Sequence, residues 1–187
     1  PVEITGRGAG KPVGLAMTGG TVDIRRMPDA GARKSGGRGG GPLRLSLDRL
    51  VISSGVALTG FRGDFTLSGG IKGDFTARVN GGSPVSGNVA PAPRGTAVRF
   101  RSADAGATLR DAGLFQSASG GALSVLLVPR DGNGNYDGQA RITDTRVRNA
   151  NVLAELLNAI SVVGLLEQLD GSGLVFNEVQ GEFLLTP

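Results

Sequence analysis

The 187-residue sequence contains no cysteine and no histidine, and its aromatic residues make up only 4% of the chain. Without cysteine there are no disulfide bonds and no thiolate chemistry. Without either residue the chain also lacks the usual zinc ligands, Cys–His nucleophiles and histidine general bases. Most hydrolase and metalloenzyme functions are therefore excluded, and we expect no catalytic residues, no bound metal and no cofactor.

Positive charge is in modest excess, with a formal net charge of +4. A basic balance suits nucleic acid or anionic lipid. Stacking of bases needs aromatic side chains, however, and these are scarce. Residues 33–41 form a short arginine–glycine tract, RKSGGRGGG, and a single copy of this kind is more often a linker than an RNA-binding segment. We therefore expect no nucleic-acid partner.

Glycine is abundant, with 33 residues of 187, which is more than twice the usual share of about 7%. The glycines follow no Gly-X-Y period, which excludes collagen, and their number argues against a mainly helical fold. Short strands joined by tight turns fit better. From residue 43 the pattern is clear, because Leu43, Leu45 and Leu47 alternate with polar residues.

The strongest strand signal is a repeat of Gly-Asp-Phe-Thr at residues 63–66 and 73–76. Around it, apolar side chains alternate with charged ones, which predicts an antiparallel meander with one apolar and one polar face. The residues predicted to share the apolar face are Phe61, Phe65, Leu67, Ile71, Phe75, Ala77 and Val79. The same alternation recurs at Leu123, Val125 and Leu127, and again at Val179, Phe183 and Leu185.

The most apolar stretch is residues 152–169, VLAELLNAISVVGLLEQL. Its length would suit a membrane span, but Glu155 and Glu167 would each cost about 2–3 kcal/mol inside a bilayer. We predict two short helical pieces hinged near Gly164 instead. A further helix is expected near residues 104–114, with Asp104 as its N-cap.

The predicted fold is therefore mainly β: an antiparallel meander forming a curved sheet or open groove, with two inserted helical segments, near 104–114 and 151–169. We divide the chain into a glycine-rich meander at residues 1–95, with a mobile loop at 28–42, and a second β region at residues 96–187. One continuous sheet is expected to join them.

Several short motifs have simpler structural explanations. The stretch TGRGAGKP at residues 5–12 resembles a phosphate loop, but Pro12 stands where Ser or Thr is required, so a turn is favoured. Residues 131–138, DGNGNYDG, resemble a calcium loop, but Tyr136 occupies the position of the essential glycine, so a hairpin turn is favoured. The sequence RGD at residues 62–64 falls inside a predicted strand. The carboxylates of Asp104, Asp111 and Glu155 fit solvated helix faces.

The second half of the chain resembles the C-terminal region of the AsmA-like family, large envelope proteins of Gram-negative bacteria. The matching elements lie in order over about residues 96–187: Asp104-Ala105-Gly106, Gly120-Gly121-x-Leu123, Leu156-Leu157 through Ser161 to Gly164-Leu165, and Gly171-x-Gly173 with Phe176. One departure is Asn151, where proline would be expected. Residues 1–95 share with the family only the general pattern of strands punctuated by glycine.

The resemblance implies a long β-sheet curled into a groove with an apolar interior, in a periplasmic protein anchored in the inner membrane by a helix that precedes this chain. It also implies that the protein moves phospholipids toward the outer membrane, with acyl chains as its ligand. A start at Pro1 suits a piece of a longer protein.

In this interpretation nine residues are the candidates for lining the groove: Phe61, Phe65, Leu67, Ile71, Phe75, Val79, Leu123, Val125 and Leu127. Leu157, Ile160 and Leu165 are candidates for a plug at its end. The alternative is a non-enzymatic structural or assembly domain with a closed β core. An enzyme would need a cleft of acidic and arginine residues that the sequence does not indicate.

Overall fold

The computed structural model describes residues 2–5, 14–26, 40–131, 134–148, 161–166 and 174–186. Within them the chain is mainly β, with 13 strands in a single sheet. The strands are β1 (Val2–Thr5), β2 (Gly14–Thr18), β3 (Thr21–Asp23), β4 (Pro42–Val51), β5 (Ala57–Thr66), β6 (Lys72–Val79), β7 (Pro84–Ala92), β8 (Gly95–Ser102), β9 (Ala118–Ser119), β10 (Ala122–Pro129), β11 (Tyr136–Val147), β12 (Ser161–Leu166) and β13 (Leu174–Leu185).

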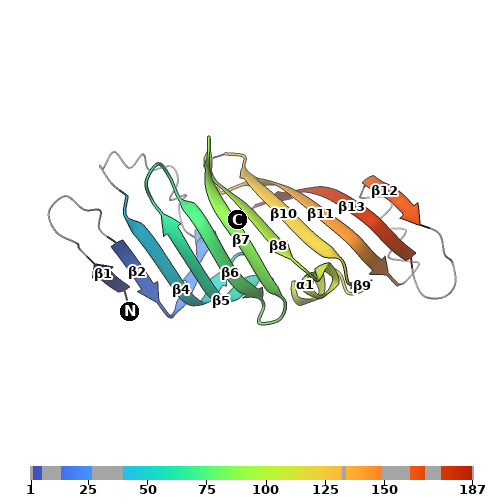
Figure 1. Ribbon diagram of the computed structural model, residues 1–187, viewed down its shortest axis with the longest axis horizontal. Helices are drawn as coiled ribbons and strands as arrows, with labels where there is room; N and C mark the ends of the chain where they lie inside the picture. Colours follow the sequence, from blue (N-terminus) through green and yellow to red (C-terminus); the bar gives the residue numbers. More distant parts are fainter. Residues whose placement is uncertain are drawn as a thin grey trace.

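The sheet is open, with β1 at one end and β12 at the other (Figure 1). Eleven strands form its main path, in the order β1-β2-β4-β5-β6-β7-β8-β10-β11-β13-β12, while β3 pairs with β4 and β9 with β11. Among the pairs formed by these described strands, only β2–β4 and β3–β4 are parallel. The prediction of a mainly β, mostly antiparallel sheet is confirmed.

The prediction of two inserted helices is wrong, because the described part of the chain contains one α-helix, α1 (Ala105–Asp111), besides a 3₁₀ turn at Ile24–Arg26. Asp104 caps α1 as expected, since its carboxylate accepts a hydrogen bond of 2.9 Å from the Ala107 amide. In Figure 1 the helix lies at one end of strands β8 and β10.

The second predicted helix falls partly on β12. Residues 161–166 form this edge strand, which pairs antiparallel with β13 so that Val162 lies opposite Val179. Two adjacent β-branched residues, Val162 and Val163, followed by Gly164, favour a strand over a helix wherever a partner strand is available. The rest of the predicted helix, residues 151–160 and 167–169, lies outside the described residues.

Two of the predicted turns can be compared with the structure. Strands β10 and β11 pair antiparallel on either side of the predicted turn, where the Arg130 amide donates to the Asn135 carbonyl at 2.9 Å and the Asn135 side chain donates to Asp131 at 2.8 Å. The predicted hairpin turn is thus confirmed. The predicted loop at 28–42 ends earlier than expected, because Pro42 already belongs to β4. Residues 28–39, like 6–12 of the phosphate-loop motif, lie outside the described residues.

The Gly-Asp-Phe-Thr repeat sets how β5 and β6 pack. The two copies pair antiparallel, so that Gly63 lies opposite Phe75 and Phe65 lies opposite Gly73. The rings of Phe61 and Phe75 stack with their centroids 5.3 Å apart. Each phenylalanine therefore covers the bare backbone of a neighbouring strand, and the repeat forms the centre of the hydrophobic core.

Candidate functional site

The apolar face of the sheet is organised in rows that run across the strands. In antiparallel and parallel pairs alike, directly opposite residues lie on the same face, so the pairing register defines each row. Ten strands contribute one residue each to a row that we call the outer apolar row: Ile4, Leu15, Leu43, Phe65, Gly73, Val89, Val98, Leu127, Gly138 and Phe183. This row contains no polar side chain.

A second row lies beside it, which we call the inner apolar row. Its members are Val2, Met17, Leu45, Gly63, Phe75, Gly87, Phe100, Val125, Ala140 and Gly181. It too contains no polar side chain over ten strands. The pairing register therefore continues both rows from β1 to β13.

The predicted lining residues all come from this face or from the turn beside it. Phe65 and Leu127 belong to the outer row, and Phe75 and Val125 to the inner row. Phe61, Val79 and Leu123 lie deeper and are buried. Leu67 and Ile71 belong to the turn between β5 and β6, not to the strands, and are half-buried.

The middle of the face is closed to solvent by its own side chains. Phe61, Phe65 and Phe75 are only 5%, 7% and 6% exposed. The outer row is more accessible away from this cluster, since Leu15, Leu43, Val89, Val98 and Leu127 are half-buried and Phe183 is 42% exposed. The face thus combines a packed centre with a partly open outer row.

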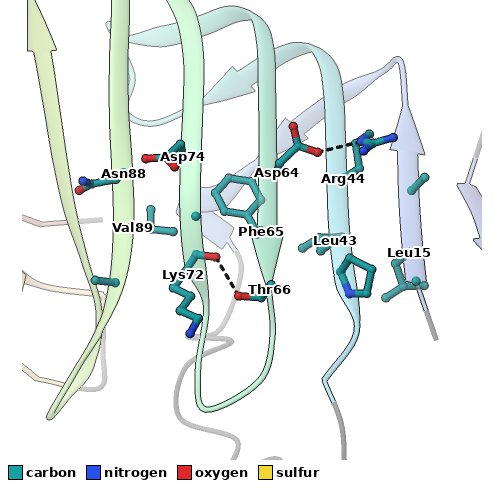
Figure 2. Close-up of a pocket in the computed structure, with 15 residues that line it drawn as sticks. Leu15, Leu43, Arg44, Asp64, Phe65, Thr66, Lys72, Asp74, Asn88 and Val89 are labelled. Carbon is teal, nitrogen blue, oxygen red and sulfur yellow. Dashed lines mark hydrogen bonds and ion pairs between the residues drawn. The ribbon is translucent and has the colours of Figure 1, made fainter. Parts of the chain in front are cut away.

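A groove of about 980 Å³ lies where β2, β4, β5, β6 and β7 end (Figure 2). Five consecutive members of the outer apolar row contribute to its lining: Leu15, Leu43, Phe65, Gly73 and Val89. Polar-face positions of the same strands supply the remaining residues, among them Arg44 and Asp64, whose ion pair at 2.8 Å is drawn in Figure 2. The groove therefore has both apolar and charged walls.

Helix α1 holds one end of the apolar face in place. Ala105 packs with Leu123 and Val125, while Ala112, at the helix C-cap, packs against the cluster that contains the phenylalanines. Phe100 contacts both clusters. The helix therefore joins the two halves of the core.

The C-terminal end of α1 is fixed to the β6–β7 turn by Asp111. Its carboxylate accepts hydrogen bonds from the Ser83 amide at 2.6 Å and from the Ser83 hydroxyl. These bonds, the hydroxyl first, lower the pKa of Asp111 below its usual value. The Asn80 side chain, in a left-handed backbone conformation with φ of 47°, donates to the Asp111 carbonyl at 2.7 Å and to the Gly55 carbonyl at 2.9 Å.

Several residues of the rows were not predicted from the sequence. Val89, Val98 and Phe100 continue the apolar face through β7 and β8. Their alternation was the signal that could have found them, but proline and glycine interrupt it at residues 84–95. Of the three predicted plug residues, Leu157 and Ile160 lie outside the described residues, whereas Leu165 belongs to the edge strand β12, opposite Phe176.

Among the described residues no group of three acidic side chains gathers as a metal site would require. In that same part of the chain, no helix has the length and apolarity needed to cross a bilayer.

Comparison of the chain with models of protein families, with curated proteins and with solved structures finds no match. Membership of the AsmA-like family therefore stays a prediction that rests on the sequence resemblance.

Proposed function

We propose that this chain is a periplasmic segment of an AsmA-like envelope protein and carries phospholipid acyl chains along its outer apolar row. The observation that supports this most directly is the row itself, with ten strands in register and no polar side chain. Nine strand spacings of about 4.8 Å make a track of about 43 Å.

The chemistry of such a track suits a sliding ligand. An acyl chain loses about 0.8 kcal/mol for each methylene that returns to water, so it needs apolar contact along its whole path. The acyl chain must also meet no tight polar binding site, because tight binding at one place would prevent it from sliding along the row. The half-buried members of the row leave room for this contact, and the lipid headgroup would remain at the solvent side of the strand ends.

In the proposed protein the chain acts between the inner and outer membranes, and a preceding segment supplies the anchor in the inner membrane. The charged wall of the 980 Å³ groove, with Arg44 and Lys72, lies next to the apolar members of the outer row. An amphiphile could therefore keep its acyl chain on the row and its polar end in this groove.

The experiment uses two neighbouring residues on opposite faces of β13. Phe183 belongs to the outer row and is 42% exposed, while Leu184 points to the polar face and is 51% exposed. Because both side chains are exposed, neither Phe183→Asp nor Leu184→Asp should unfold the sheet. Native mass spectrometry with lipid extraction should find co-purified phospholipid in the parent chain and in Leu184→Asp, and much less in Phe183→Asp.

A second candidate function is a structural or assembly domain with a closed core. It is favoured by the low exposure of the stacked Phe61, Phe65 and Phe75 rings. A lipid-free mass in all three proteins, together with one cooperative melting transition, would support this candidate and contradict lipid transfer by this segment.

A further inference from the structure

The polar face of the sheet also carries an ordered row, which contains no acidic residue. We call it the arginine–hydroxyl row, because its members, each opposite the next from β2 to β12, are Thr18, Ser46, Arg62, Thr76, Ser86, Arg101, Ser124, Arg141, Gln180 and Ser161. Hydroxyl, amide and guanidinium groups all donate hydrogen bonds. The row is therefore a line of donors across the sheet.

Its centre brings two arginines to either side of one hydroxyl. Arg101 on β8 and Arg141 on β11 both lie directly opposite Ser124 on β10. Their Cα atoms are two strand spacings apart, or about 10 Å. An arginine side chain is long enough to cover half that distance, so both guanidinium groups can reach one anion above Ser124.

The positive charge at this place is only partly neutralised. The side chains of Arg101 and its neighbour Arg99 make no hydrogen bond or ion pair within the part of the chain that the structure describes. Strands β7, β8 and β10, which surround them, contain no acidic residue. Arg141 donates one hydrogen bond to Glu178 at 2.6 Å, and its guanidinium keeps further donors.

Two hollows meet at the same three residues. One, of about 670 Å³, and another, of about 710 Å³, are both lined by Arg101, Ser124 and Arg141. Elsewhere the same face carries acidic residues, including Asp64 and Asp74, which lie opposite each other. A flat anionic membrane would meet these carboxylates. Glu182 and Asp104 also line the two hollows, but a single anion above Ser124 would lie nearest to Arg101 and Arg141, which are directly opposite this residue.

We propose that Arg101, Ser124 and Arg141, assisted by Arg99, form a binding site for the phosphate group of a soluble phosphate ester. The planar guanidinium matches two phosphate oxygens at once, and the serine hydroxyl supplies a further donor. The site lies on the face opposite the apolar rows, so it does not depend on lipid transfer.

The test is a titration of the full chain by nuclear magnetic resonance, with inorganic phosphate and glycerol 3-phosphate as probes, at constant ionic strength. Saturable shifts are expected for the Nε–H signals of Arg99, Arg101 and Arg141 and for the Ser124 amide. Arg101→Gln should weaken binding about tenfold, the value of one lost charge-assisted hydrogen bond. Glu178→Gln should strengthen it, because a competing carboxylate is removed.

The matched control is Arg25→Gln, which changes an arginine outside this row that already pairs with Asp23 at 2.6 Å and should leave the phosphate affinity unchanged. Equal, non-saturating shifts at all arginines would show simple charge screening and overturn the proposal. So would an unchanged affinity in Arg101→Gln. Binding only to vesicles of phosphatidylglycerol and phosphatidylcholine, with no response to either soluble probe, would indicate a membrane-facing surface and would also overturn it.

Discussion

Phe183 on β13 lies directly opposite Gly138 on β11, and a Cβ atom at position 138 would overlap the Phe183 ring. The same relationship joins Phe75 to Gly87 on the neighbouring strands β6 and β7. Both glycines leave room for an aromatic ring on the adjacent strand. The two pairs differ in burial, since Phe183 is 42% exposed and Phe75 is 6% exposed.

This difference predicts unequal effects of the same substitution. Gly87→Ala should lower the free energy of unfolding by about 1–3 kcal/mol, the usual cost of overpacking a core, because its Cβ would meet the Arg99 carbonyl and the buried ring of Phe75. Gly138→Ala should change it by about 0.5 kcal/mol or less, because the exposed Phe183 ring can turn away. Urea denaturation of both variants measures the two changes in the free energy of unfolding. Equal decreases in the two variants would contradict this prediction.

Part of this arrangement could be predicted from the sequence. Strict alternation around the Gly-Asp-Phe-Thr repeat identified the buried positions Phe61, Phe65 and Phe75, because a period of two places them on one face whatever their partners are. Leu67 and Ile71 fit the same alternation, yet they lie in a turn. The sequence does not show at which residue a hairpin reverses.

The rows could not be predicted, because they depend on pairing between distant segments. Helix α1 and β9 separate β8 from β10 in the sequence, and β13 lies between β11 and β12 in the sheet. Only the register of those pairs brings Val98, Leu127, Gly138 and Phe183 into line. The apolar run at 161–166 was ambiguous for a similar reason, since short apolar runs fit a helix or a strand until a partner is known.

Asp111 should make stability depend on acid pH. Its pKa is lowered in the folded chain, so the ionised carboxylate stabilises the fold above the ordinary pKa of 3.8, and this contribution is lost as pH falls through the lower folded value. Asp111→Asn removes the charge but keeps an acceptor for the Ser83 donors. The parent chain should therefore have the higher denaturant midpoint at neutral pH, and the gap should narrow as the solution is acidified below 3.8.

The matched variant for Asp111 is Ser83→Ala, which removes the hydroxyl donor but leaves the backbone hydrogen bond to Asp111. It should raise the pKa of Asp111 toward the ordinary value, seen as a shift of the carboxyl carbon signal during a pH titration. If the difference in denaturant midpoint between the parent chain and Asp111→Asn stays constant across the whole pH range, the role assigned to this carboxylate is contradicted.

Asn80 should tolerate replacement by glycine better than replacement by alanine, because its backbone is in the left-handed region. Its amide group donates to the carbonyls of Gly55 and Asp111 and accepts from the Ala57 amide at 2.9 Å. Asn80→Ala loses these bonds and strains the left-handed backbone, which should cost about 1–3 kcal/mol of unfolding free energy. Asn80→Gly loses the bonds but relieves the strain, so it should melt at a higher temperature than Asn80→Ala. The reverse order would be inconsistent with this account.

The outer apolar row should be a continuous track rather than a local pocket. Three of its members, Leu15, Val89 and Leu127, lie on different strands, and only the first two line the 980 Å³ groove. Each has a sequence neighbour that faces the other way: Ala16, Asn88 and Val128. A photo-crosslinking amino acid placed at each of the six positions in turn reports which face meets lipid. Irradiation in the presence of phospholipid should yield lipid adducts, detected by mass spectrometry, at all three row positions. The three neighbours should give little or none, because their side chains lie on the polar face. Adducts at Leu15 and Val89 but not at Leu127 would instead indicate one binding pocket at the 980 Å³ groove, which the first two residues line and from which an acyl chain could not slide along the sheet.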